Sequence, residues 1–342
     1  MKPKHILVIR LSAMGDVAMT IPVLQQLLHQ NPDIKITVLT QNFMAPLYEP
    51  LERTAVHSIE TKGKHKGLTG LYRLFGELKK QYQFDAIADL HNVLRSKVIN
   101  SLFKIAGVKT ASIDKGRKEK RELTSRRNKS LVQLKTSFQR YADVFNSLGL
   151  PLVLDVFQLP FSKQSLPTGI APQFAVAKKN ICIAPFAKHE EKMYPPAKMK
   201  MIIQKLSGNS HYQLYLLGGG KNEVAILDEW AKEFPAVINL AGKYSFKEEL
   251  AIISHMDLMV SMDSANMHLA SLFGVPVVSI WGATHPFAGF YGWAQPAANA
   301  VQIDLYCRPC SVFGNKPCYR GDHACMQQLP EDIIIEKVTT VV

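Results

Sequence analysis

The stretch "VSMDSANMHLASLFGVPVVSIWG", residues 260–282, contains the clearest β-α-β pattern of the chain. An apolar strand ends at Asp263, a turn of small residues follows, and an amphipathic helix leads into a second apolar strand. This order is typical of a parallel sheet. The backbone N–H groups of Ser264, Ala265 and Asn266 open the helix and would favour a phosphate, with Asp263 beside it for sugar hydroxyls. The alternative is that Asp263 is an ordinary N-cap and His268 a helix-face residue.

The same alternation extends in both directions. Downstream of a proline-punctuated segment, short apolar runs alternate with helical ones through "NICIAPF", "YQLYLLGGG", "VINLAG" and "DLMVSMD". Upstream, the runs "HILVIR", "KITVLT", "AVHSIE", "FDAIADL" and "KTASID" alternate with helices. We therefore predict an α/β protein of two Rossmann-like, doubly wound domains that face a central cleft, over 1–165 and 166–328. A C-terminal helix is predicted over 329–342, and we consider packing of this helix back on the first domain.

Composition limits the possible partners. The 342 residues are 47% hydrophobic and 20% charged, which is typical of a folded globular protein. Forty-one basic and 28 acidic side chains give a net charge of +13, which favours anionic partners. No aromatic stacking or RRM signature accompanies these charges, so we expect no nucleic-acid partner. No export signal and no transmembrane segment are recognised, and we predict a cytoplasmic protein.

A second strand end carries an acid near the start of the chain. "RLSAMGD", residues 10–16, follows the apolar run Ile6–Ile9 and delivers Gly15 and Asp16 in a tight turn. Asp16 would serve either as a helix cap, accepting backbone N–H groups, or as a catalytic carboxylate. Sequence alone leaves both open at this point.

Two further turns of the second domain suggest ligand contacts. "LLGGGKNE", residues 216–223, ends a strand in glycines and places Gly219 and Glu223 where a ribose would lie. Its spacing is neither G-x-G-x-x-G nor a P-loop. "APFAKHEEKMYP", residues 184–195, carries Lys192, which would neutralise a diphosphate, although surface lysines are usually only solvated.

One segment of the first domain is rich in basic residues, and a histidine follows another of its strands. "KGRKEKRELTSRRNK", residues 115–129, has eight basic and two acidic side chains. The simplest interpretation is a solvated loop; the functional one is that its cations bind carboxylates or phosphates. The candidates are Arg117, Lys120, Arg121, Arg126 and Arg127. "DLHNVLRS", residues 89–96, ends another strand and adds His91 and Arg95.

Four of the five cysteines lie close together in the sequence near the end of the chain. Cys307, Cys310, Cys318 and Cys325 are spaced C-x2-C-x7-C-x6-C. Four thiols can bind one structural zinc ion, but this spacing is looser than that of a zinc ribbon, so a reduced, packed loop is the alternative.

Taken together, "RLSAMGDVAMTIPVLQQL", "SMDSANMHLASLFGVPVVSIWG" and the tail "CRPCSVFGNKPCYRGDHACMQQLPED" resemble the lipopolysaccharide heptosyltransferases of glycosyltransferase family nine. This resemblance implies the GT-B fold and an inverting transfer without a catalytic cofactor. It implies that Asp16 is the base, that Lys192 contacts the diphosphate and that Asp263 holds the donor sugar. It also implies that His268 lies near the diphosphate, and that Glu223 and Tyr244 contact the ribose and adenine.

The resulting expectation is a transferase that moves a heptose from ADP-heptose to an acidic, lipid-linked saccharide, peripherally at the inner face of the cytoplasmic membrane. Two alternatives stay open. The first is a transferase of the same fold with another nucleotide-sugar donor, and the second is a non-catalytic two-lobed protein that binds nucleotide sugars.

Overall fold

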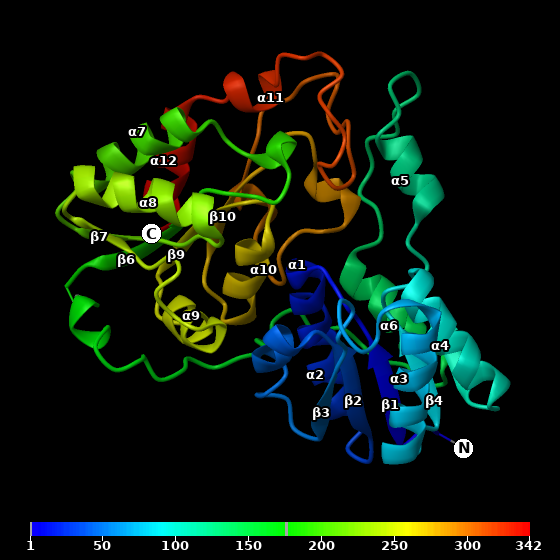
Figure 1. The fold of residues 1–342 in the computed structure, drawn as a ribbon. Helices are drawn as coiled ribbons and strands as arrows, with labels where there is room; N and C mark the ends of the chain where they lie inside the picture. Colours follow the sequence, from blue (N-terminus) through cyan, green and yellow to red (C-terminus); the bar gives the residue numbers. More distant parts are fainter. Residues whose placement is uncertain (1, 175–176) are drawn as a thin grey trace. The chain divides into compact units, whose positions relative to one another are not determined.

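The computed structural model describes residues 2–174 and 177–342. The chain divides into two compact units. Unit 1 comprises the chain up to Lys115 together with Thr136–Pro160, and unit 2 comprises Gly116–Lys135 together with the described residues from Phe161 onward. Each unit is built around its own parallel sheet, which confirms the predicted α/β class (Figure 1).

Unit 1 has a five-stranded sheet in the order β3-β2-β1-β4-β5. All five strands of the sheet are parallel, and they are β1 (His5–Ile9), β2 (Lys35–Thr40), β3 (Thr54–Ser58), β4 (Ala86–Asp89) and β5 (Lys109–Ser112). The helices of the unit are α1 (Met14–Ala18), α2 (Thr20–Gln30), α3 (Gly67–Gln81), α4 (Leu94–Ile105) and α6 (Ser137–Ser147), with a 3-10 turn η1 (Asn42–Leu47).

The central strand β1 explains why the unit folds around this sequence. Every residue of "HILVI" is buried, as expected for a parallel strand that is covered on both faces. Its last residue, Ile9, pairs with Leu39 of β2 and with Asp89 of β4. The residues that follow β1 and β4 are therefore neighbours at one edge of the sheet.

Unit 2 has a six-stranded sheet in the order β11-β10-β9-β6-β7-β8. The strands are β6 (Lys179–Ala184), β7 (Tyr212–Leu216), β8 (Val237–Asn239), β9 (Leu258–Met262), β10 (Val277–Ile280) and β11 (Ala300–Val301). The longer helices are α7 (Pro196–Ser207), α8 (Lys221–Glu233), α9 (Phe246–Ile253), α10 (Ala265–Leu272) and α12 (Glu331–Val341), with short α5 (Arg117–Leu123) and α11 (Ala324–Gln327). Short 3-10 turns are η2 (Ala171–Gln173), η3 (Glu190–Lys192), η4 (Pro286–Ala288) and η5 (Ala297–Asn299).

The C-terminal helix corrects one expectation. α12 lies beside α7 and contacts β9, β10 and β11 (Figure 1). Its side chains Ile334 and Val338 are fully buried in the core of unit 2. Packing of this helix on the first domain is therefore wrong, because its apolar face completes the core of the second unit.

The basic segment corrects another expectation. Residues 117–123 form helix α5 rather than a loop, and Gly116–Lys135 belongs to unit 2 although its neighbours in the sequence belong to unit 1. Leu123 and Leu134 are buried with Ala288 in a small cluster of unit 2. The charge pattern of the segment does not predict that it packs on unit 2, because this packing is made by the two leucines.

Candidate functional site

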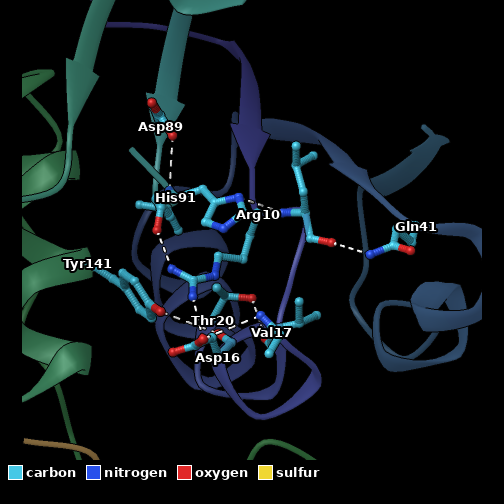
Figure 2. A network of polar contacts seen from close by, with 11 residues as sticks. Arg10, Asp16, Val17, Thr20, Gln41, Asp89, His91 and Tyr141 are labelled. Carbon is cyan, nitrogen blue, oxygen red and sulfur yellow. Dashed lines mark hydrogen bonds and ion pairs between the residues drawn. The ribbon is translucent and has the colours of Figure 1, made fainter. Parts of the chain in front are cut away.

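Asp16 lies in the first turn of α1, directly after β1. Its Oδ2 accepts the backbone N–H of Ala13, three residues earlier, at 3.3 Å. Asp16 therefore caps α1 from within the first turn, and the N-cap position itself is Ala13 rather than Asp16. The same oxygen is 2.6 Å from Nη2 of Arg10. The Tyr141 hydroxyl donates to the backbone carbonyl of Asp16 at 3.3 Å (Figure 2). Three neighbours thus fix the turn and the carboxylate together.

Arg10 is the buried centre of this arrangement, as Figure 2 shows. Its Nη1 donates to the carbonyl of Leu90 at 2.7 Å, because the register of β1 and β4 places these residues side by side. The side chain of Arg10 is 8% exposed, whereas that of Asp16 is 29% exposed. The buried guanidinium therefore holds the carboxylate in place, and the carboxylate remains partly exposed.

His91 lies against the same turn. Its Nδ1 accepts the backbone N–H of Leu11 at 3.4 Å, and the backbone N–H of His91 donates to Oδ1 of Asp89 at 2.9 Å. Burial, followed by the positive charge of Arg10, lowers the pKa of His91 to about 3. The imidazole is therefore neutral at physiological pH. With Nδ1 accepting a hydrogen bond, its proton is on Nε2, which makes Nε2 a donor.

The remaining predicted acceptor residues of unit 1 differ in exposure. Arg95, in the first turn of α4, is exposed, and its charge also lowers the pKa of His91 after burial and Arg10. Gly15 lies within α1 next to Asp16. The structure thus brings Gly15, Asp16 and His91 to the edge of the sheet where β1 and β4 end.

In unit 2, Lys192 and Asp263 form a second ion pair. Nζ of Lys192 is 2.8 Å from Oδ2 of Asp263, and the hydroxyl of Thr284 donates to the same oxygen at 2.8 Å. Asp263 follows β9, Thr284 follows β10, and Lys192 ends the turn η3. Asp263 is buried, with its side chain 7% exposed. Three segments of the chain therefore fix one carboxylate.

Gly314 makes room for this lysine. A Cβ at Gly314 would lie 2.3 Å from Cγ of Lys192, and the residue has a positive φ of +71°. Only glycine therefore permits both the backbone conformation and the stem of Lys192 in this place. Sequence reasoning missed Gly314 and Thr284. The signal for Thr284 was its position just after a predicted strand adjacent to the strand that ends at Asp263.

Helix α10 begins immediately after Asp263. Ser264 is its N-cap in extended conformation, and its hydroxyl lies 3.0 Å from that of Ser261. Ser264, Ala265 and Asn266 are partly exposed, so the helix start is accessible, whereas His268 is buried. The structure thus brings the pair Lys192–Asp263 next to a helix N-terminus.

The glycine-rich turn before α8 is held by the carboxylate of Glu223, which lies in the first turn of that helix. Oε2 of Glu223 accepts the backbone N–H of Gly219 at 2.8 Å. No atom lies within 4 Å of a Cβ placed on Gly219, so that position faces open space. Tyr244 instead lines a cavity of about 500 Å³ along β8, with Asn239 and Lys243 among its neighbours.

The five predicted cations of the basic segment differ in burial and in their contacts. The ammonium of Lys120 is buried and lies 4.3 Å from the ring centroid of Phe290. Arg126 is stacked 4.2 Å from the ring centroid of Tyr319. Arg117, Arg121 and Arg127 are exposed. The five predicted cations therefore do not form one equivalent set.

The four-thiol zinc site does not form. Within residues 2–174 and 177–342, no group of three or more His, Cys, Asp or Glu side chains could hold a metal ion. The cysteine loop is organised instead by Arg308, which is buried and donates to the carbonyls of Gly282 at 2.6 Å and Thr284 at 3.1 Å. The described cysteines are free thiols, and a buried guanidinium among them disfavours a further cation.

No helix in the described ranges is both long and apolar enough to cross a bilayer.

Comparison with known proteins supports a transferase. Residues 71–317 match the model of glycosyltransferase family 9 (heptosyltransferase). A relative from Escherichia coli, "Lipopolysaccharide heptosyltransferase 3", is 26% identical and aligns over 84% of this chain and 85% of its own. "Lipopolysaccharide core heptosyltransferase OpsX" from Haemophilus influenzae is 25% identical over 83% of this chain and 80% of its own.

Solved structures share the fold. E. coli heptosyltransferase WaaC, solved with ADP and with ADP-2-deoxy-2-fluoro heptose, has a TM-score of 0.69. In each case the identity is 17%, over 99% of this chain and all of that one. The two parallel-sheet units are thus those of the GT-B heptosyltransferase structures. The chain belongs to glycosyltransferase family 9, the heptosyltransferases, and is a glycosyltransferase.

Proposed function

We propose that this protein transfers a heptose from ADP-heptose, with inversion, to the inner core of lipopolysaccharide or a related lipid-linked saccharide. The family supports heptosyl transfer, and the names of the relatives support the lipopolysaccharide acceptor. The ADP and ADP-sugar ligands of WaaC support the donor. The observation that carries the proposal is the partly exposed Asp16 carboxylate, fixed by a buried arginine that follows β1.

Asp16 is the proposed general base. An ionised carboxylate takes the proton of the acceptor hydroxyl as that oxygen attacks the anomeric carbon and the bond to the diphosphate breaks. Inversion in a single displacement needs no covalent sugar intermediate, so one base is sufficient. The family match begins at residue 71, so this role is supported by the geometry of the turn and by its motif rather than by that match.

Unit 2 is the proposed donor unit. The Lys192 ammonium and the start of α10 at Ser264, Ala265 and Asn266 would stabilise the negative charge on the departing ADP, with His268 nearby. Asp263 would hold the sugar. Glu223, beside Gly219, and Tyr244 would contact the ribose and the base. On this proposal no cofactor is required, because protein cations neutralise the diphosphate; turnover that persists in excess chelator would support it.

The acceptor would meet unit 1 at Gly15, His91 and Arg95. The Nε2–H of a neutral His91 suits an acceptor oxygen as a hydrogen-bond partner, and Arg95 suits a carboxylate or phosphate. The exposed cations Arg117, Arg121 and Arg127, which belong to unit 2, would suit anionic groups of the acceptor. We propose a cytoplasmic enzyme at the inner face of the cytoplasmic membrane, where such an acceptor is anchored.

The test compares donors and then turnover. Isothermal titration with ADP, UDP and GDP should show a clear preference for ADP, and incubation of ADP-heptose with a lipid-linked core saccharide should yield the extended saccharide and ADP. Preference for another nucleotide would favour a different donor. Tight binding without turnover on any acceptor would favour a non-catalytic binding protein.

A further inference from the structure

We propose that unit 2 has a docking surface for an anionic lipid bilayer, formed by residues 117–132 and by the loop Tyr306–Arg320. We name it the basic–aromatic surface. The proposal rests on the proposed function only in that a lipid-linked acceptor brings the enzyme to a membrane. It assigns the membrane contact to particular side chains of unit 2.

The two segments of this surface are fastened to each other and to unit 2. Nζ of Lys129 donates to the carbonyls of Cys307 at 2.9 Å and Pro309 at 2.8 Å. The Lys120 ammonium lies over Phe290, and the backbone N–H of Leu134 donates to the carbonyl of Phe287 at 2.9 Å. The basic segment is therefore held at three points, and its exposed side chains have a defined position on the unit.

Large apolar side chains are exposed on this surface. Leu131 and Val132, which lie between the attachments at Lys129 and Leu134, are 51% and 55% exposed. Phe313 is 52% exposed and Tyr306 77% exposed, both on the adjoining loop. A single exposed apolar residue needs no explanation, but several on two segments fastened together are typical of an interaction surface.

Cations lie on the same two segments as these side chains. Residues 115–129 have eight basic side chains against two acidic ones, and Lys118, Arg121, Arg127 and Lys316 are exposed. Arg126 is stacked on Tyr319, and the guanidinium of Arg320 lies 5.4 Å from the ring centroid of Tyr306. Aromatic rings with a polar edge and long cationic side chains are both suited to the boundary between lipid tails and head groups.

A bilayer fits this combination better than a saccharide does. A saccharide acceptor would be bound by charge and hydrogen bonds, and it gives no reason to expose Leu131, Val132 and Phe313 to water. An anionic bilayer uses both parts of the surface, because its phosphates attract the cations and its interface accepts the apolar side chains. The net charge of +13 acts in the same direction.

The experiment is co-sedimentation of the full chain with lipid vesicles. Vesicles of phosphatidylcholine alone are compared with vesicles that contain one third phosphatidylglycerol. We expect partition into the anionic vesicles, with much less into the neutral ones, and weaker partition as sodium chloride is raised. Equal partition into both vesicles, or no partition into either, would overturn the proposal.

Two double variants test the two parts of the surface. Lys118→Ala with Lys316→Ala should lower the partition coefficient about 25-fold, since each cation near an anionic surface contributes about fivefold. Leu131→Ser with Val132→Ser should lower it about tenfold or more, because both side chains lose apolar burial. All four residues are exposed, so unfolding curves should stay close to wild type.

The matched controls are in unit 1. Lys80→Ala with Lys104→Ala removes the same charge, and Leu68→Ser with Ile105→Ser removes two apolar side chains that are 64% and 85% exposed. These variants should partition like wild type. A loss as large as that of the surface variants would show that the binding is not local to unit 2 and would overturn the assignment.

A lipid-free core saccharide separates docking from transfer. Leu131→Ser with Val132→Ser should keep wild-type transfer to this acceptor while it loses vesicle partition. A loss of that transfer with partition retained would assign the surface to the saccharide instead. If the wild type partitions as expected but transfers no heptose to any acceptor, the proposed function fails while the docking surface stands.

Discussion

The ion pairs Arg10–Asp16 and Lys192–Asp263 are built in opposite ways. In unit 1 the cation is the buried partner: Arg10 is 8% exposed and Asp16 29%. In unit 2 the anion is the buried partner: Asp263 is 7% exposed and Lys192 15%. In each pair the buried member has a second anchor, the Leu90 carbonyl for Arg10 and the Thr284 hydroxyl for Asp263.

The difference shows which charge each site presents. A buried charge is tolerated only when it is paired and hydrogen-bonded, so the buried member fixes its partner in position. Unit 1 therefore presents a carboxylate, which suits removal of a proton. Unit 2 presents an ammonium, which suits a diphosphate.

The largest expected effect comes from Asp16→Asn. The amide keeps the size of the side chain and can still accept the Ala13 N–H, but it cannot take a proton at neutral pH. Single-turnover transfer should fall by roughly 10² to 10⁴ while ADP titration stays close to wild type. Asp33→Asn, an exposed acid of the same unit, is the control and should transfer normally.

Because Arg10 loses its charged partner in this variant, thermal unfolding is measured first, and rates are compared where both proteins are folded. A folded Asp16→Asn protein with the wild-type rate would leave Asp16 as a helix cap and ion-pair partner only.

Lys192→Ala is next in size. Loss of a charge-assisted contact to the diphosphate, about 1.5 to 3 kcal/mol, should weaken ADP binding about ten- to 150-fold. Lys188→Ala, which removes an exposed lysine of the same loop, should bind ADP normally. The double variant Lys192→Ala with Asp263→Asn shows whether the loss comes from a stranded buried carboxylate. Recovery of ADP affinity in the double variant would remove Lys192 from the diphosphate site.

The pH dependence of the free energy of unfolding tests whether His91, buried beside the Arg10 cation, is neutral. Burial and then Arg10 lower the pKa of His91 to about 3, from an unfolded value of 6.5. The unfolded chain therefore takes up the proton first, and the contribution of His91 to stability is present above pH 6.5 and lost as pH falls toward 3. At pH 5 the loss is about 2 kcal/mol.

Urea unfolding at pH 7 and pH 5 measures this loss. His91→Asn keeps an acceptor for the Leu11 N–H but does not titrate, so its free energy of unfolding should fall less between the two pH values. Parallel pH dependences for the variant and wild type would contradict a neutral buried imidazole.

The smallest expected effect is that of Thr284→Val. It removes one hydrogen bond to Asp263 and leaves the Lys192 ion pair in place, so ADP affinity should fall by about two- to tenfold, or ~0.5 to 1.5 kcal/mol. Thr284→Ser retains the hydroxyl and should bind ADP like wild type. If Val and Ser behave alike, the hydroxyl has no part in fixing Asp263.

The alternation of apolar runs was enough to predict ten of the eleven described strands. "KITVLT" forms β2 over all six of its residues. β11, with only two residues, was missed, because a strand so short has no periodicity. Helix α5 was treated as a loop, because its charges conceal Lys120 and Leu123 as buried positions.

Local sequence by itself determined where the candidate acids lie. Asp16 and Asp263 each follow a buried strand, and parallel strands put such residues at one edge of a sheet. Only the tertiary structure decided what holds them. Leu90, which follows β4, anchors Arg10 from 80 residues along the chain, and Thr284, which follows β10, donates to Asp263 from 21 residues along. It also decided that the basic segment belongs to unit 2 and that four nearby cysteines make no metal site. These outcomes depend on packing between segments distant in the chain, which spacing and charge along the sequence do not specify.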